Sequence, residues 1–304
     1  ALGAAASVFS IHNLAYQGLF PLPLLARAGL APHEAASGSP WEFWGQLNCM
    51  KAGILGADLV ATVSPRYAEE IASGAEYGHG LEGVLAGRRD RLVGILNGID
   101  GDSWSPATDS WLAQTYDTAT VAAGKAANKA ALQAELGLPQ RPELPLLGIV
   151  SRLVHQKGCD LFGPISERLM RLPLQLVVLG SGTPAIEAIF AEMAGRYPDK
   201  VKLELRFDEA LAHRIEAGAD FFLMPSRYEP CGLNQLYSMR YGTLPIVRET
   251  GGLADTVSDL DVDPVGGRGF VFRAALPAQL LATIERALRL YAEPEALLAV
   301  RRRI

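Results

Sequence analysis

Short apolar runs alternate with helical patterns through the second half of this chain. One helical pattern opens at Thr183-Pro184 and continues with apolar residues three or four positions apart, and another opens at Pro277. Apolar runs separated by helices are typical of a parallel, right-handed, doubly wound sheet. The six runs that we expect to form its strands are residues 146–150, 174–179, 201–207, 221–224, 244–247 and 269–272.

The first half shows the same alternation with fewer strands. Residues 48–56 are predicted as a helix, and Ser64 is predicted to cap a second one. Residues 22–45 are predicted as loop and short helix, and the glycine-rich segment 74–83 as loop. The three expected strands are residues 8–11, 59–63 and 92–96. Because a doubly wound sheet commonly has five or six strands, we expect the missing ones upstream of Ala1.

A polar, turn-rich segment, residues 98–106, is predicted as a hinge, and residues 120–136 as a helix that Gly137 ends. We therefore expect an α/β protein of two Rossmann-like doubly wound domains that face a cleft. Residues 1–97 would be the C-terminal part of an incomplete N-terminal domain, and residues 98–304 a C-terminal domain truncated at its end. The chain starts without Met and stops just past a helix, so we expect a segment of a longer protein.

Composition narrows the function classes. With 304 residues, 49% hydrophobic and 20% charged, the chain has the composition of a soluble globular protein. A net charge of -5 argues against nucleic acid as a partner, and no run of about 18 apolar residues predicts a membrane span. Cys49, Cys159 and Cys231 share no metal-ligand spacing and cannot all pair, which favours a reducing compartment.

Unusual residues gather where the predicted strands end, which is where open α/β sheets bind ligands. His12 follows the first strand of the chain, and Arg152 and Lys157 follow the strand at 146–150. Gly180 and Gly182 follow the next strand, and the loop 248–253 follows the fifth strand of this half. Together with the segment 225–233, the three loops of the second half are expected to converge on one edge of its sheet, four loops in all.

The segment 225–233, Pro-Ser-Arg-Tyr-Glu-Pro-Cys-Gly-Leu, joins a buried strand to a helix. Pro230 suits the first helical position, and the amides of Cys231, Gly232 and Leu233 could face an anion. Glu229 beside that anion would suit a hydroxyl-rich partner, which indicates a sugar attached to a diphosphate. The alternative is that Glu229 caps its helix and Cys231 packs in the core.

Arg152 and Lys157 could stabilise a departing nucleoside diphosphate, because the first offers a planar fork and the second a compact charge. The alternative is a pair of solvated surface cations. Two Asp-x-Asp sequences, at 100–102 and 261–263, match a metal-binding pattern formally, but we interpret both as solvated turns. The Gly180-Ser181-Gly182 sequence lacks the last glycine of a dinucleotide fingerprint, since residue 185 is Ala.

Long ordered motifs carry a resemblance to a known family. These are residues 12–18 (His-Asn-Leu-Ala-Tyr-Gln-Gly), 51–53, 62–65, 97–100, 151–158, 225–233, 241–243 and 251–257. In them the chain resembles bacterial glycogen synthase and plant starch synthase, retaining glucosyltransferases with the two-Rossmann (GT-B) fold. The resemblance implies transfer of glucose from ADP-glucose to the 4-hydroxyl at the non-reducing end of an α-1,4-glucan. It implies no metal or other cofactor, and a cytoplasmic or plastid location.

The resemblance also assigns residues. Arg152 and Lys157 would bind the diphosphate, Glu229 would hold donor glucose hydroxyls, and His12 would lie against the donor sugar from the acceptor-side domain. Those four are the candidate catalytic residues. The candidate substrate-binding residues are Asn13, Asn97, Cys231, Gly232, Leu233, Gly180, Gly182, Thr250 and Gly251. A Lys-Thr-Gly-Gly loop, a His-Asp-Trp-His segment and the last helix of the family have no counterpart here, and Asn234 stands where many relatives carry Thr. We therefore expect the segment alone to be inactive.

Two alternatives remain. A phosphorylase-like enzyme would need a lysine for pyridoxal phosphate in the helix 234–241, which has none, and relatives with a second Glu eight residues after Glu229 meet Tyr237 there. A non-catalytic glucan-binding segment is the other alternative. The sequence does not choose between ADP-glucose and UDP-glucose as donor.

Overall fold

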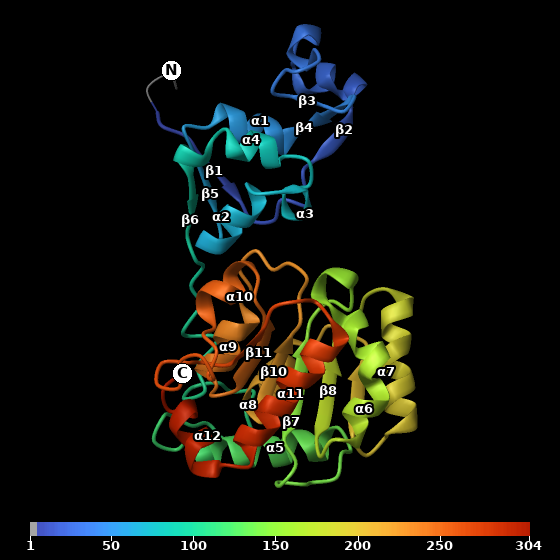
Figure 1. The fold of residues 1–304 in the computed structure, drawn as a ribbon, viewed down its shortest axis with the longest axis vertical. Coiled ribbons are helices and arrows are strands. Elements are labelled where there is room, and N and C mark those ends of the chain that lie inside the picture. Colours follow the sequence, from blue (N-terminus) through green and yellow to red (C-terminus); the bar gives the residue numbers. More distant parts are fainter. Residues whose placement is uncertain (1–4) are drawn as a thin grey trace. The chain divides into compact units, whose positions relative to one another are not determined.

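The computed structural model describes residues 5–304, and the chain divides into two compact units, Ala1–Asn97 and Gly98–Ile304 (Figure 1). Each unit has its own parallel β-sheet. The predicted α/β class with two parallel sheets is confirmed. Among residues 5–304, each helix is too short or too polar to cross a lipid bilayer.

The second unit contains six strands in which every neighbouring pair is parallel. Their spatial order is β12-β11-β10-β7-β8-β9, so the chain builds outward from β7 in one direction and then from β10 in the other. The order reverses between β7 and β10, which is where ligands bind in doubly wound sheets. The strands are β7 (Leu146–Val150), β8 (Gln175–Leu179), β9 (Val201–Glu204), β10 (Phe221–Met224), β11 (Leu244–Arg248) and β12 (Phe270–Phe272).

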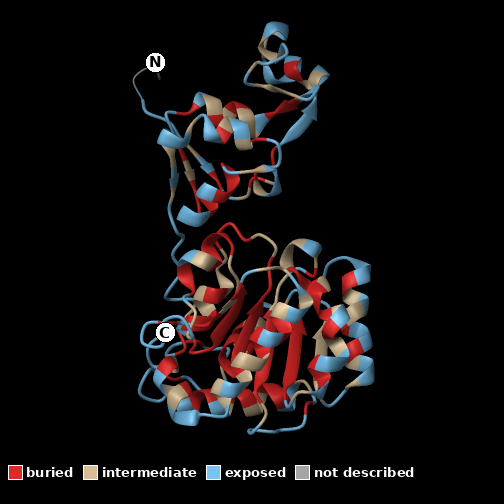
Figure 2. Ribbon diagram, viewed as in Figure 1, coloured by how far each residue is buried: buried red, intermediate tan, exposed pale blue. Residues whose placement is uncertain are grey.

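Helices cover both faces of this sheet, and its strands are almost entirely buried (Figure 2). Successive strand residues point to opposite faces, so Leu147 packs in a cluster with Phe162 and Phe190, while Leu146 packs in another with Leu132. This two-sided burial explains why the strands have continuous apolar sequences. The helices are α5 (Val121–Glu135), α6 (Ser166–Arg171), α7 (Pro184–Arg196), α8 (Glu209–Gly218), α9 (Asn234–Arg240), α10 (Gly251–Thr256), α11 (Pro277–Tyr291) and α12 (Pro294–Arg301), with 3-10 turns η4 (His155–Lys157) and η5 (Cys159–Ile165).

Buried polar contacts tie the outer helices to the sheet. Asp220, directly before β10, accepts hydrogen bonds from Lys129 Nζ at 2.8 Å and Arg301 Nη2 at 2.5 Å. The segment that leads into α5 is held by Trp104, whose ring stacks between those of His213 and Tyr237 with centroids 3.8 Å away on each side. These contacts fix α5 and α12 to the segment before β10, and the segment before α5 to α8 and α9.

The first unit contains the three predicted strands as a parallel sheet of order β1-β5-β6. Ser64 caps α2 as predicted, since its hydroxyl accepts the Tyr67 amide at 2.9 Å. Asn48 caps α1 in the same way through the Lys51 amide at 2.8 Å. The elements are β1 (Val8–Ile11), α1 (Cys49–Gly56), β5 (Leu59–Thr62), α2 (Pro65–Ile71), α3 (Ala75–Gly78), α4 (Glu82–Ala86), η3 (Arg89–Arg91) and β6 (Leu92–Gly94).

Residues 22–45 form two 3-10 helices and connecting loops, as predicted, except that Glu42 and Phe43 join a small antiparallel sheet of order β2-β4-β3, whose strands are too short to show a period in sequence. Two other local predictions were wrong. The glycine-rich segment 74–83 holds α3 and part of α4 rather than loop alone. Pro230 does not open α9, which begins four residues later because Gly232 takes a left-handed φ of +71°. The small sheet consists of β2 (Leu19–Pro21), β3 (Glu42–Phe43) and β4 (Gln46–Asn48). Two 3-10 helices, η1 (Leu22–Ala28) and η2 (Pro32–Ala35), lie between β2 and β3 in the chain.

Candidate functional site

Loops at the carboxyl ends of β7, β8, β10 and β11 are joined to one another by backbone hydrogen bonds. The Arg227 amide donates to Gln156 O at 2.8 Å, which links the loop after β10 to that after β7. The Leu153 amide donates to Ser181 O at 2.9 Å, and the Gly252 amide donates to Glu229 O at 3.1 Å. The predicted convergence of four loops on one sheet edge is therefore present in the second unit.

Glu229 is the most enclosed charged residue of this edge, with 6% of its surface exposed. Its Oε2 accepts a hydrogen bond from Lys157 Nζ at 2.6 Å and another from the Ser226 hydroxyl at 2.9 Å. Ser226 and Glu229 lie in one loop, whereas Lys157 comes from the turn after β7. A buried carboxylate requires such partners, because an unpaired charge out of water is strongly unfavourable.

A cavity of about 240 Å³ opens at this point, between the ends of β7 and β10. It lies where the strand order reverses, the place at which doubly wound sheets bind their ligands. Five of the predicted site residues line it: Arg152, Lys157, Glu229, Gly232 and Leu233. The structure thus brings the two predicted cations and the predicted carboxylate to a single cavity.

Two backbone amides on the cavity wall are available to a ligand. Within residues 5–304, the amides of Gly232 and Leu233 donate no hydrogen bond to another protein atom. Asn234, which starts α9, is held in place because its side-chain amide donates to Val150 O at 2.7 Å, at the end of β7. The amides of Gly232 and Leu233, together with Arg152 and Lys157, are suited to donate hydrogen bonds to the oxygens of an anionic group such as a diphosphate.

Glycines allow these loops to approach one another closely. A Cβ on Gly158, whose φ is +68°, would lie 2.0 Å from Pro225 O. A Cβ on Gly251, whose φ is +44°, would lie 2.0 Å from Glu229 O. Any larger residue at either position would push apart the turn that carries Lys157 or the loop that carries Glu229.

Other predicted residues support the edge without lining the cavity. Gly180 and Gly182 follow β8, and a Cβ on Gly182 would lie 2.0 Å from Leu153 O. Thr250 precedes α10 and is fully buried, and Cys231 is a buried residue of the loop that carries Glu229. These residues shape the backbone that surrounds Glu229 and Lys157.

The remaining predicted residues belong to the first unit. His12 is exposed at the carboxyl end of β1, as predicted from the sequence pattern. Asn13 follows it, and its side-chain oxygen accepts the Ala15 amide at 3.0 Å, which fixes the turn. Asn97 is exposed at the end of this unit.

Sequence reasoning missed some residues of the site. Ser226 was not singled out, although its position three residues before Glu229 is a spacing that allows contact within one turn. Cys159 lines the cavity, and burial raises the pKa of its thiol to about 11, so the thiol is neutral near pH 7. Phe207, after β9, has 91% of its surface exposed at the same edge of the sheet, an unusual place for a phenylalanine.

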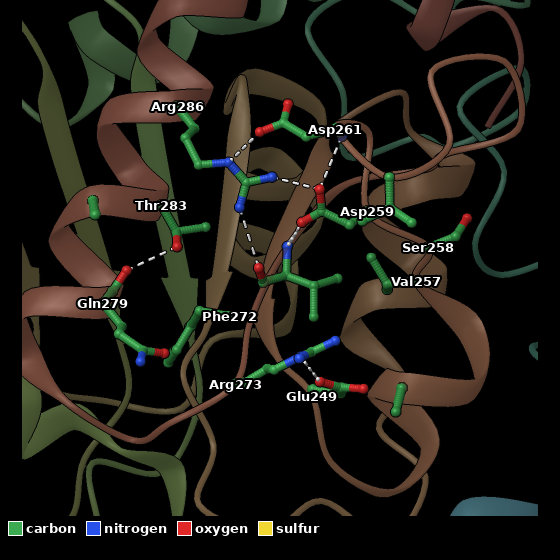
Figure 3. A pocket seen from close by; sticks show the side chains of 14 residues that line it. Glu249, Val257, Ser258, Asp259, Asp261, Phe272, Arg273, Gln279, Thr283 and Arg286 are labelled. Atoms are coloured by element: carbon green, nitrogen blue, oxygen red, sulfur yellow. Dashed lines mark hydrogen bonds and ion pairs between the residues drawn. The ribbon is translucent and has the colours of Figure 1, made fainter.

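A larger cavity, about 730 Å³, lies between α10, β12 and α11 (Figure 3). Its charged side chains pair with one another: Arg286 Nε donates to Asp261 at 2.7 Å and also contacts Asp259, and Arg273 Nε donates to Glu249 at 3.1 Å. None of the predicted site residues lines it. Asp261, which lines this cavity, and Asp263, which does not, are both exposed. Residues 5–304 contain no cluster of three or more His, Cys, Asp or Glu side chains suited to a metal.

Two family models match the chain. Residues 133–299 match the model described as glycosyl transferases group 1, and residues 1–87 match the model described as starch synthase catalytic domain. The two matches fall largely in the second and the first unit, respectively.

Curated relatives of similar sequence are glycogen synthases. Glycogen synthase 1 of Methylococcus capsulatus is 51% identical over 302 residues, which are 97% of this chain and 60% of the relative. Glycogen synthase of Anaeromyxobacter dehalogenans is 52% identical over 296 residues, which are 97% of this chain and 62% of the relative. The chain thus spans about three fifths of the length of these relatives.

Solved structures agree with the fold. The catalytic domain of starch synthase IV from Arabidopsis thaliana, bound to ADP and acarbose, superposes with a TM-score of 0.91 at 38% identity, over 99% of this chain and 63% of that one. Sucrose-phosphate synthase from Thermosynechococcus elongatus superposes with a TM-score of 0.58 at 20% identity, over 97% of this chain and 61% of that one, and shares the fold.

Proposed function

Because this chain belongs to the group 1 glycosyl transferases, we propose that the complete protein is an α-1,4-glucan synthase. It transfers glucose from ADP-glucose to the 4-hydroxyl at the non-reducing end of an α-1,4-glucan, with retention of configuration at the anomeric carbon. The observation that carries the proposal is the single cavity at the strand-order reversal that Arg152, Lys157 and Glu229 line together.

The donor contains two chemically different parts, and the cavity has a matching group for each. Arg152 and Lys157 offer positive charge to the diphosphate, and the amides of Gly232 and Leu233 add neutral donors. The Glu229 carboxylate is an acceptor for sugar hydroxyls. A site built only for phosphate would not place a buried carboxylate beside its cations, because like charges repel.

During transfer, the bond from the anomeric carbon to the diphosphate oxygen breaks, and a bond to the acceptor oxygen forms. The electron pair of the broken bond stays on the phosphate oxygen of ADP, and this oxygen takes up the proton that the acceptor hydroxyl loses. Positive charge stabilises the leaving diphosphate, and removal of such a contact commonly costs about 10² to 10³ in turnover. Arg152 and Lys157 supply that stabilisation in our proposal, which requires no metal or other cofactor.

The contact between Lys157 and Glu229 has a role before the donor binds. Lys157 neutralises the buried carboxylate when no donor is bound, and a bound donor offers both residues new partners, hydroxyls for Glu229 and phosphate for Lys157. The pair is therefore suited to bind sugar and diphosphate together rather than either alone.

In our proposal, the ring of Phe207 stacks on the nucleobase of the donor. Its ring is exposed at the carboxyl end of β9, two strands from β7, and aromatic rings stack well on nucleobases. A ring in this place accounts for an exposed phenylalanine and adds affinity for the nucleotide without choosing between adenine and uracil. We propose the cytoplasm as the compartment, in keeping with cysteines that form no disulfide within residues 5–304.

The test is an assay of the complete protein with ADP-glucose or UDP-glucose and a maltooligosaccharide primer, with released nucleoside diphosphate as the readout. We expect primer-dependent release of ADP and products longer by one glucose. A Glu229→Gln variant that keeps its fold is the control and should lose most of the turnover. Glucan binding without release of either diphosphate would favour a non-catalytic glucan-binding protein and contradict the proposal.

A further inference from the structure

A tryptophan at the tip of the β3–β4 hairpin occupies a backbone conformation that suits it poorly. Trp44 and Gly45 form the two-residue turn, with φ of +52° and +78°. Turns with positive φ at both positions favour Asn-Gly, because a bulky side chain at positive φ is strained. Trp44 is one of two non-glycine residues with positive φ among residues 5–304.

Packing within the described chain does not explain this residue. The Trp44 side chain has 85% of its surface exposed, and its ring meets that of Phe43 edge-on with centroids 6.1 Å apart. A strained and exposed aromatic residue stabilises neither the turn nor the core. Strain of this kind concentrates at sites that bind ligands.

The hairpin holds Trp44 firmly. Glu42 accepts the Gly45 amide at 2.9 Å and the Gly38 amide at 3.3 Å. Lys51 Nζ donates to Glu42 O at 2.6 Å and to Ser39 O at 2.9 Å. The ring of Phe43 rests on Gly80, where a Cβ would approach it to 3.0 Å. The exposed indole is therefore presented on a fixed support.

One face of the small sheet continues from this tip. Pro21 on β2, Gln46 on β4 and Phe43 on β3 lie opposite one another in register and therefore point to the same face. Pro21 and Gln46 are exposed, and the Gln46 side chain makes no hydrogen bond within residues 5–304. This face of the sheet thus combines the rings of Phe43 and Pro21 with the side-chain amide of Gln46.

The chemistry of this surface matches a neutral sugar polymer. Within residues 42–48 the charged side chain is Glu42, and its two carboxylate oxygens already accept hydrogen bonds from the Gly38 and Gly45 amides. Rings bind the apolar faces of hexoses, and a free amide can both donate to and accept from hydroxyls. Complete burial of Trp44 and Phe43 would remove at most about 500 Å² from water, less than the roughly 800 Å² per partner of a stable protein dimer.

We propose that Trp44, with Gln46, Phe43 and Pro21, forms an anchoring surface for an α-1,4-glucan on the first unit. This inference rests on the proposed function for its choice of sugar. A glucose ring stacks on the Trp44 indole, and neighbouring hydroxyls bond to the Gln46 amide. The surface retains a long glucan and has no part in the transfer itself.

The test uses the complete protein with Trp44→Asn, because asparagine suits the turn and removes the indole. We expect about tenfold weaker binding of long amylose in affinity electrophoresis, the size of effect that an exposed aromatic anchor gives. The melting temperature should equal or exceed that of the wild type, since strain is relieved. Turnover with maltotriose should stay within twofold. Trp111→Asn is the matched control, because Trp111 is also exposed, at 52%, but lies in the other unit.

Amylose binding within twofold of wild type in Trp44→Asn, or an equal loss in Trp111→Asn, would overturn the proposal. So would a wild-type dimer that Trp44→Asn dissociates in sedimentation, because a second copy would then be the occupant. If Trp44→Asn fails to fold, Trp44→Gly and Gln46→Ala carry the same test. Failure of the proposed function is seen separately, as a wild-type protein that releases no diphosphate from either donor.

Discussion

Lys157 and Glu229, 72 residues apart in sequence, form a salt bridge of 2.6 Å at the edge of the sheet where its strand order reverses. Only the fold brings them together, since one follows β7 and the other follows β10. The short distance and the low exposure of Glu229 mean that neither side chain can be changed without an effect on the other.

Replacing Lys157 with Ala should lower both turnover and stability. Turnover should fall by about 10² or more, because a charge on the leaving diphosphate loses its partner. Stability should fall by about 1–3 kcal/mol, because Glu229 is left buried beside Ser226 alone. The measurements are steady-state release of ADP and urea unfolding of the complete protein.

The double variant Lys157→Ala with Glu229→Gln separates the two effects. It removes the unpaired charge, so we expect it to recover most of the lost stability while turnover stays low. A double variant as unstable as Lys157→Ala would show that the pair is not the cause of the stability loss. The coupling between the two substitutions is read from the complete four-protein cycle.

Arg152 should behave differently because it is exposed. Its guanidinium donates to Gln156 at 3.3 Å, and no core packing depends on it. Arg152→Ala should reduce turnover by about 10² or more and change stability by less than about 0.5 kcal/mol. Arg152→Lys is the matched control and should recover only part of the activity, since lysine lacks the planar fork. Turnover of Arg152→Ala within twofold of wild type would remove this residue from the site.

The strands could be predicted from the sequence because each is buried on both faces and therefore continuously apolar. Leu146 to Val150 and Phe221 to Met224 match their expected limits without change. The expected strand 201–207 ends three residues early, at Glu204, since Leu205 to Phe207 are exposed beyond the sheet edge. Apolar composition alone does not distinguish a buried strand end from an exposed apolar loop.

The candidate site was predictable only in part. Placement after strand ends indicated that Arg152, Lys157 and Glu229 would share one edge, and they line one cavity. The salt bridge between Lys157 and Glu229 was not foreseen, because side-chain distances across two loops are set by tertiary packing. The Trp44 hairpin was missed for a different reason: its strands have two or three residues and no measurable period.

Gly251 should be intolerant of a side chain. Its φ of +44° disfavours other residues, and a Cβ would lie 2.0 Å from Glu229 O, so Gly251→Ala must displace the loop that carries Glu229. We expect a loss of about 1–3 kcal/mol of stability together with at least tenfold lower turnover, measured by urea unfolding and ADP release. Gly195→Ala is the control, since Gly195 lies inside α7 with open space around it and alanine is the better helix former. If both variants behaved alike, the close approach would not matter.

Asp220 should contribute most of its stabilisation through its ion pairs with Lys129 and Arg301. Burial by itself acts to raise the pKa of this carboxyl, but the two cations and the Leu146 amide outweigh burial and hold the pKa below its usual value. Asp220→Asn leaves both cations without their partner and should cost about 3–5 kcal/mol near pH 7, as loss of one partner of a buried pair does. Urea unfolding of the complete protein measures the change.

The Asp220 carboxyl also makes the free energy of unfolding depend on pH, and the direction of this dependence follows from its pKa. Because the folded pKa of Asp220 lies below the unfolded value of about 3.9, its contribution is fully present above that pH. It is lost as the pH falls through the lower, folded pKa. The stability difference between wild type and Asp220→Asn should therefore be constant from pH 7 to about 5 and shrink below about pH 4. Asp199→Asn, at an exposed position, should follow the wild type throughout, and a difference for Asp220→Asn that grows on acidification would reverse the assigned sign.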